Sequence, residues 1–454
     1  MVLKEDFLKS INHCTGFERA ALIEAHQHSP SVSIRLNPDK VDQHSLVLDE
    51  NNLLLEVPWC SNAFFLKERP SFTLDPLFHA GAYYVQEASS MFLRHVVNEV
   101  LKDGKGNKAL DLCAAPGGKT TLLASMQQFG LVVSNEIIQS RVGVLQENAI
   151  KWGNKKILVS NNDPSDFKRL SGFFDFVMID APCSGSGLFR KDEKAMKEWN
   201  PGLVDFCAAR QKRILHAAID TVAEGGYLFY STCSFSSEEN EDNLDFLMDT
   251  GLFESVDIPV DETWGVVSSC SSKHGASGYR FYPDKVRGEG FFCGLLRKTK
   301  TLNAEYIDLP LPLAAFQPKL NMSDWVKGIE NLLLFKKEEE LFAFDQAYAQ
   351  ELALLSKLLR LRKSGLRMGE LIRDEFVPNH ELAMSSIQSL SLPSVELDLA
   401  QSLKYLRRET LDLDVLQKGW TLVKYKKISL GWIKIVQGKA KNHYPLNWRI
   451  LMRG

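Results

Sequence analysis

The sequence predicts an α/β protein in which a parallel, doubly wound sheet forms the centre and smaller domains flank it. Between residues 108 and 298, strand-like apolar segments alternate with segments whose apolar residues recur at helical spacing. This alternation is typical of parallel strands joined by helices on both faces of one sheet. On either side of this part the pattern changes to shorter elements, which predicts separate small domains.

Within the central part, the expected strands are KALDLCA, LVVSNEI, KILVSNND, FDFVMIDAP, GYLFYSTCS and FFCGLLRK. The intervening segments SRVGVLQENAIKW and LVDFCAARQKRILHAAIDTVAEG carry the i, i+3, i+4 spacing of amphipathic helices.

The flanking parts differ from each other. Residues 1–75 contain the strand-like pieces SVSIRLN and NNLLLEVPW and two helical patterns, which predict a small α+β domain of RRM-like type. A Leu-rich linking region follows residue 300. From about residue 390, short aromatic and basic stretches punctuated by Gly431, Gly438 and Pro445 predict a small β-rich domain. The expected division is therefore 1–75, 76–300, 301–389 and 390–454.

Composition and charge exclude several classes of protein. The chain is 44% hydrophobic and 24% charged with a formal net charge of -3, which is ordinary for a globular protein. No apolar run of about 18 residues predicts a membrane span, and the start lacks the apolar stretch of a secretory signal. No two of the eight cysteines form the CxxC spacing of a zinc site. We therefore expect a cytoplasmic, monomeric protein with reduced thiols, no bound metal and no membrane partner.

A loop rich in Ala and Gly, Asp111-Leu-Cys-Ala-Ala-Pro-Gly-Gly-Lys-Thr120, follows the first expected strand. Small residues let a ligand approach the backbone, and the N–H groups of the helix that begins near Lys119 are free to bind it. A phosphate-binding P-loop would need glycine where Cys113 stands, and the GxGxxG spacing of dinucleotide sites is missing. S-adenosylmethionine is the remaining candidate ligand.

Two carboxylates support this cofactor. Glu136 ends the second expected strand, where it can accept hydrogen bonds from ribose hydroxyls, and Asp163 ends the third, near the expected position of the adenine amine. Either residue alone would usually be a capping or turn carboxylate. Together, at consecutive strand ends behind this loop, they favour a cofactor site.

Two cysteines stand where strands give way to polar loops, in Asp180-Ala-Pro-Cys183-Ser and Thr232-Cys233-Ser. A cysteine inside an apolar strand is usually a small core residue. Cys183 and Cys233 instead fall on the edge of the sheet that holds the cofactor.

A thiol suits methylation of an aromatic carbon. C5 of cytosine is a poor nucleophile until a thiolate adds to C6, and a free thiol with a pKa of about 8.5 needs a site that favours the anion. An acid at N3 eases the addition, and Asp180 is placed for this. A second thiol or a water can assist the later release of the product. Methylation of a protein or a small molecule would not require the cysteine pair.

These residues resemble the Nol/Nop/Sun family of RNA cytosine-C5 methyltransferases. The similar segments span roughly residues 30–298, in the family's order: FHAGAYYVQEASSMF, DLCAAPGGKT, SNE, IDAPCSGSG, YSTCSFSSEENE and RFYPDKVRGEGFFC. The resemblance implies a class I methyltransferase sheet of order 3-2-1-4-5-7-6 with an antiparallel last strand.

The resemblance also implies the roles of individual residues. Cys233 is the expected nucleophile, Cys183 helps to expel the product, and Asp180 completes the catalytic set. The residues expected to contact the cofactor are Cys113, Ala114, Ala115, Pro116, Gly117, Gly118, Lys119, Glu136, Asp163 and Asp180.

The end of the chain is similar to the bacterial 16S ribosomal RNA methyltransferase F type, whose members carry a PUA-like RNA-binding domain. RNA, as 16S rRNA or the small ribosomal subunit, is therefore the expected partner; transfer RNA is the alternative, because the same core serves both.

The charge of the C-terminal stretch also favours RNA binding, because from Lys418 to Arg453 it has nine Lys or Arg and no acid. Its aromatics Trp420, Tyr425, Trp432, Tyr444 and Trp448 are either stacking residues or core. Arg35 is the candidate RNA contact in the N-terminal domain.

Overall fold

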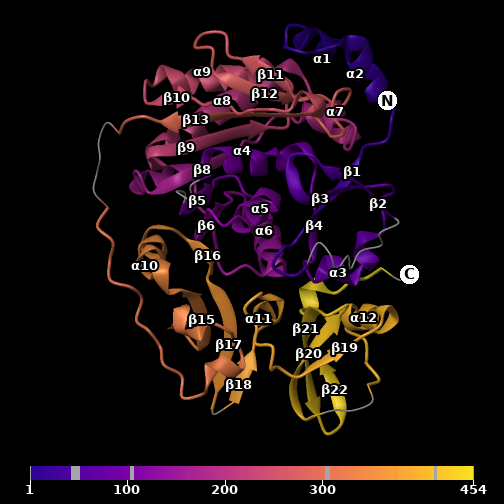
Figure 1. The fold of residues 1–454 in the computed structure, drawn as a ribbon, viewed down its shortest axis with the longest axis vertical. Helices are drawn as coiled ribbons and strands as arrows, with labels where there is room; N and C mark the ends of the chain where they lie inside the picture. Colours follow the sequence, from indigo (N-terminus) through magenta and orange to yellow (C-terminus); the bar gives the residue numbers. More distant parts are fainter. Residues whose placement is uncertain are drawn as a thin grey trace.

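The computed structural model describes residues 2–41, 52–102, 107–301, 307–373, 375–413 and 417–452. Arg453, the last basic residue of the C-terminal stretch, and Asn51, which opens the strand-like NNLLLEVPW, lie outside these ranges. Figure 1 shows the central sheet in the upper part of the molecule, with two smaller sheets of the C-terminal third below it.

The central sheet runs in the order β11-β12-β13-β9-β8-β5-β6-β7-β16, and β10 also pairs with β13. From β7 to β9 all neighbours are parallel, whereas β13 lies antiparallel to β9. This confirms the expected methyltransferase order with its antiparallel strand. The six expected strands are β5 (Lys108–Asp111), β6 (Leu131–Asn135), β7 (Ile157–Ser160), β8 (Phe174–Asp180), β9 (Val222–Thr232) and β13 (Phe291–Lys298).

Four further strands of this sheet had no clear sequence signal. They are β10 (Phe253–Ser255), β11 (Val267–Cys270), β12 (Ser277–Phe281) and β16 (Leu361–Ser364). The last of them comes from the Leu-rich linking region and pairs antiparallel with β7 at the opposite edge of the sheet from β11. The linking region is thus joined to the central sheet by main-chain hydrogen bonds.

Helices cover both faces of the sheet, so apolar side chains of its strands are buried on either face. Successive residues of a strand point to opposite faces, so Ala109 packs in the same core cluster as Leu122, whereas Leu110 packs with Leu215. The first face is covered by α4 (Leu93–Val100), α5 (Gly118–Ala124) and α6 (Gln139–Trp152), and the second by α8 (Pro201–Ala218) and α9 (Glu241–Asp249).

The N-terminal segment contributes two helices and a separate sheet. Its helices α1 (Glu5–Ser10) and α2 (Arg19–Ala25) pack against the methyltransferase part, where Phe7 lies 5.0 Å from Phe189 and 6.2 Å from Phe235, ring centre to ring centre. Its sheet has the order β2-β3-β1-β4. The strands are β1 (Val32–Leu36), β2 (Leu53–Val57), β3 (Cys60–Leu66) and β4 (Tyr83–Val85), so the sheet extends past residue 75.

The C-terminal third forms two more sheets. The first joins β14 (Leu332–Lys337), β15 (Glu340–Asp345), β17 (Leu366–Ile372) and β18 (Glu375–Pro378); the second joins β19 (Ser394–Glu396), β20 (Gly419–Tyr425), β21 (Ile428–Val436) and β22 (Lys439–Asn442). Trp432 on β21 and Tyr444, two residues after β22, are each 1% exposed. These two aromatics are core residues, so the stacking interpretation was wrong for them. Trp420, Tyr425 and Trp448 are partly exposed.

No helix within the described ranges is both long and apolar enough to cross a membrane.

Arg35 on β1 does not face solvent, and the expectation that it touches RNA was wrong. Its guanidinium is buried: it donates to Gln86 Oε1, to the Gly118 carbonyl and to Thr121 Oγ1 at 3.0, 3.2 and 2.7 Å, and lies 4.5 Å from the centre of the Trp152 ring. Burial lowers the pKa of Arg35 to about 10, so it remains charged at neutral pH. Arg35 therefore ties the N-terminal sheet to α5 and α6.

We expect Arg35→Met to lower the free energy of unfolding by about 1–3 kcal/mol, because the acceptors that Arg35 satisfies would stay buried without a donor. Chemical denaturation measures this change. The folded variant should bind RNA as the unchanged protein does. A variant of normal stability with weakened RNA binding would instead make Arg35 an RNA contact.

Candidate active site

The two candidate cysteines follow neighbouring parallel strands. β8 ends at Asp180 and β9 at Thr232, and Asp180 is paired in register with Ser231. Because parallel strands end at the same edge of a sheet, the loops after them meet there. The Sγ atoms of Cys183 and Cys233 lie 3.0 Å apart, and both residues are free thiols.

A cavity of about 650 Å³ opens at this edge, beside the cysteine pair. Seven of the predicted site residues line it, one or more from each strand end between β7 and β9: Cys113, Ala115, Glu136, Asp163, Asp180, Cys183 and Cys233. The structure thus brings both candidate thiols and the candidate cofactor carboxylates to one cavity.

Ala114, Pro116 and Gly117 of the predicted cofactor loop do not line the cavity but form the turn beside it. Gly117 has φ of +111°, a left-handed conformation that favours glycine, and a Cβ there would lie 3.1 Å from Leu145 Cδ1. The Ala114 N–H donates to the Asn135 carbonyl at 2.8 Å, and the Pro116 carbonyl accepts from Asn148 at 2.9 Å. These contacts fix a tight turn immediately before α5.

The cavity wall carries the two candidate cofactor carboxylates. Glu136 is nearly buried; its Oε1 accepts from the Ile138 N–H at 2.9 Å, and its Oε2 lies 3.4 Å from Arg141. Asp163 is more exposed and caps the helical turn after it, accepting from the Ser165 hydroxyl and N–H at 2.6 and 2.9 Å. These two bonds lower the pKa of Asp163. Both residues therefore present fixed acceptors, as the ribose and adenine of S-adenosylmethionine require.

Asp180 is held by an ion pair. Lys119 Nζ donates to Asp180 Oδ2 at 2.7 Å, and the Ser231 hydroxyl donates to Oδ1 at 2.9 Å. Burial lowers the pKa of Lys119, but the adjacent Asp180 carboxylate more than offsets this and raises it, so Lys119 is an ammonium. Lys119 thus supports Asp180 rather than lining the cavity itself.

Glu239 is a part of the site that the sequence did not identify. Its buried carboxylate accepts from the Ser184 N–H and hydroxyl at 2.8 and 2.5 Å, from the Ser234 hydroxyl at 2.5 Å and from Gln211 at 3.1 Å. Ser184 and Ser234 directly follow Cys183 and Cys233. A single carboxylate therefore holds both cysteine loops together. The only sequence signal was the acidic run in SSEENE.

The two thiols have different surroundings. The hydrogen bond with Cys233 and burial raise the pKa of Cys183 well above its usual range, and the Glu239 charge adds to this effect. These surroundings disfavour the thiolate form of Cys183.

Sequence reasoning also did not identify the basic side chains that line the cavity. Arg210 and Arg213 of α8 line the cavity one helical turn apart, and Arg141 and Lys168 lie on its wall. Their spacing in AARQKR was the available signal. A polyanionic substrate would meet a positive rim at this edge of the sheet.

Comparison with known proteins agrees with this geometry. Residues 98–297 match the family described as 16S rRNA methyltransferase RsmB/F, residues 3–88 match the N-terminal domain of 16S rRNA methyltransferase RsmF, and residues 392–450 match the methyltransferase RsmF PUA domain. A protein of Aeromonas hydrophila named ribosomal RNA small subunit methyltransferase F is 31% identical over 91% of this chain and 90% of its own length. The chain belongs to the RsmB/F family.

Another relative of the same name, from Vibrio parahaemolyticus, is 30% identical over 93% of this chain and 92% of its own. Among solved structures, a methyltransferase homologue from Pyrococcus horikoshii matches with a TM-score of 0.54 and 28% identity over 64% of this chain and 94% of that one. The structure of NSun6 from the same organism with SFG has the same TM-score at 20% identity, over 66% of this chain and 99% of that one, and supports the fold alone.

Membership of the RsmB/F family confirms the prediction of an RNA methyltransferase with a C-terminal PUA domain. S-adenosylmethionine is its cofactor. The cavity fits this group, since it offers a tight glycine turn and the fixed carboxylates Glu136 and Asp163 at successive strand ends.

Replacing Glu136 by Ala should weaken S-adenosylmethionine binding about 10- to 100-fold, since a charged hydrogen bond contributes about 1.5–3 kcal/mol. RNA affinity should stay the same. Calorimetry checks both, with the exposed Glu262→Ala as the matched control. Unchanged cofactor affinity in Glu136→Ala would remove Glu136 from the cofactor site.

Replacing Glu239 by Ala should lower kcat for methylation about tenfold or more, because its buried donors lose their acceptor and the cysteine loops lose their common anchor. Glu239→Gln should keep most of the activity, since the amide oxygen still accepts and serine hydroxyls can accept from the amide N–H. Cofactor affinity is the control. If Gln proved as damaging as Ala, the charge rather than the geometry of Glu239 would be what matters.

Proposed function

We propose that this enzyme methylates C5 of a cytosine in 16S ribosomal RNA, through a covalent bond between Cys233 and C6 of the base. The observation that carries the proposal is the pair of thiols 3.0 Å apart at the cofactor edge, with Asp180 beside them. An N- or O-methyltransferase has no use for such a pair, whereas an unactivated ring carbon does.

The chemistry follows from the groups in the cavity. The Cys233 thiolate forms a bond to C6, and the charge that this places on the ring is neutralised by a proton held between Asp180 and N3. Lys119, which donates to Asp180, is the group able to supply that proton. C5 is then nucleophilic. When bound, S-adenosylmethionine supplies a methyl group activated by a sulfonium.

Release reverses the addition. The C5 proton leaves to a base in the cavity, the electron pair of that bond restores the C5–C6 double bond, and the C6–S bond breaks with its electron pair on the Cys233 sulfur. The proton at N3 returns through Asp180 to Lys119. Cys183 retains its proton and lies 3.0 Å from the departing sulfur, so it can donate a hydrogen bond to the emerging thiolate. The proposed roles are therefore those that the family resemblance implies: Cys233 as the nucleophile and Cys183 in product release.

Ribosomal RNA is the proposed substrate because the relatives that match over nine tenths of the chain are named small subunit methyltransferase F. The PUA domain adds a second contact for a large RNA. Of its described basic residues, those that are exposed are Lys418, Lys426, Lys427, Lys439, Lys441 and Arg449. Their charge would contribute a salt-dependent part of RNA affinity.

The cysteine variants test the proposed mechanism. Cys233→Ala should abolish methylation and form no covalent complex, because no sulfur can reach C6. Cys183→Ala should still add to the base but release it slowly, so a protein–RNA adduct should survive a denaturing gel. Turnover by Cys233→Ala, or an adduct in that variant instead, would refute these roles.

The target is tested separately by bisulfite sequencing of cellular RNA from cells with and without the gene. The expected result is one cytosine of 16S rRNA that loses its protection when the gene is absent. Loss of protection in a transfer RNA would make transfer RNA the substrate.

A further inference from the structure

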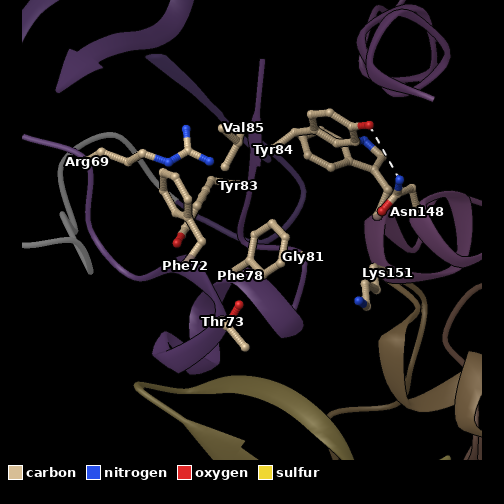
Figure 2. Close-up of a pocket in the computed structure, with 11 residues that line it drawn as sticks. Arg69, Phe72, Thr73, Phe78, Gly81, Tyr83, Tyr84, Val85, Asn148 and Lys151 are labelled. Carbon is tan, nitrogen blue, oxygen red and sulfur yellow. Dashed lines mark hydrogen bonds between the residues drawn. The ribbon is translucent and has the colours of Figure 1, made fainter. Parts of the chain in front are cut away.

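A second pocket, of about 330 Å³, lies between residues 69–85 and the last turns of α6. Figure 2 shows the side chains around it, with Arg69 beside Phe72, Phe78 near the middle, and Asn148 and Lys151 on the α6 side. It shares no lining residue with the active-site cavity. It is therefore a separate recess, formed where the N-terminal sheet meets the methyltransferase part.

The lining has the chemistry of a nucleotide site. Five aromatic side chains contribute to it: Phe72, Phe78, Tyr83, Tyr84 and Trp152. Two cations, one amide and the Thr73 hydroxyl group add polar lining, and no carboxylate is among the lining residues. Aromatic rings stack on bases, and cations bind phosphate, so this combination suits one unpaired nucleotide.

Arg69 is the cation best placed to meet a phosphate. It is exposed, and its guanidinium lies 5.3 Å from the centre of the Phe72 ring, with no carboxylate partner among the described residues. Lys151 differs, because its ammonium donates to Glu147 at 2.6 Å. The nearby Asp75 carboxylate does not line the pocket; it accepts from the Tyr83 hydroxyl and the Leu77 N–H.

The far wall of the pocket is rigid. Trp152 is held by Arg35 on its ring and by Ser125, which accepts from its Nε1 at 3.1 Å. Tyr84 lies against the cofactor loop, since a Cβ on Gly118 would be 3.2 Å from its ring. A pocket with fixed walls loses little entropy when it takes up a ligand.

The pocket also adjoins the C-terminal domain. Lys151 lies 5.7 Å from the Phe78 ring and 5.2 Å from the ring of Trp448, which follows the last strand of that domain. An RNA held by the basic C-terminal domain would thus pass close to Phe78 and Arg69.

We infer that this pocket binds one unstacked nucleotide of the substrate RNA, away from the cytosine that is methylated. The base would lie among the Phe72, Phe78 and Tyr84 rings, and its phosphate would lie on Arg69. The inference rests on the proposed RNA substrate. It adds a second contact that fixes how the RNA lies on the enzyme.

Two variants and a control test the inference. Phe72→Ala removes a stacking ring at the mouth of the pocket, and should weaken binding of the 16S rRNA fragment that carries the target cytosine about tenfold at every salt concentration. Arg69→Ala should weaken it less and reduce the slope of log affinity against log salt by about 0.7–0.9. Lys67→Ala is the matched control, because Lys67 is an exposed cation two residues from Arg69 that does not line the pocket.

The measurements are salt titrations of RNA affinity, calorimetry of S-adenosylmethionine and methylation at saturating RNA. Both pocket variants should keep normal cofactor affinity and near-normal kcat while KM for RNA rises. Photo-crosslinking of the same fragment with 4-thiouridine should label residues 69–85. If both variants bind RNA as Lys67→Ala does, or if crosslinks fall elsewhere, the inference is wrong.

A competition measurement separates RNA from free nucleotides. Excess CMP should compete weakly with the RNA fragment in the unchanged protein and less in Phe72→Ala. If CMP binds at Phe72 but RNA affinity is unchanged in both Phe72→Ala and Arg69→Ala, the pocket binds a free nucleotide and the inference fails. Absence of any cytosine methylation by the unchanged protein would refute the proposed function instead, so the two failures are distinguishable.

Discussion

The parallel pairing of β8 with β9 is the constraint on which the active site depends. It sets Asp180 opposite Ser231, and so brings the loops that carry Cys183 and Cys233 to one point of the sheet edge. A shift by one residue would turn the side chains of one strand to the opposite face and separate the thiols. The apolar packing of helices on both faces fixes this register, because every slip would expose buried side chains.

Around that pairing, two charged groups hold the site. Lys119 donates to Asp180, and the buried Glu239 carboxylate accepts from Ser184 and Ser234, the serines that follow the two cysteines. Buried charges are costly unless they are paired or hydrogen-bonded, so such an arrangement is maintained only by a rigid surrounding. The two thiols are thereby held 3.0 Å apart at the cofactor edge.

The N-terminal segment contributes to this rigidity from two directions. Phe7 packs beside Phe235, which lies in the loop after Cys233, while Arg35 fastens the N-terminal sheet to the helix after the cofactor loop. The segment is thus a support for the catalytic core as well as one wall of the pocket at Phe72.

The sequence by itself determined the central strands, the cofactor loop and the cysteine pair, because these follow from local patterns: apolar runs, small residues at a turn, and polar groups where a strand ends. The tertiary structure alone decided the roles of Glu239 and Arg35, the burial of Trp432 and Tyr444, and the addition of β16 to the sheet. Each of these depends on contacts between segments brought together only by folding. Burial and hydrogen-bond partners are properties of the packed chain, and local periodicity does not specify them.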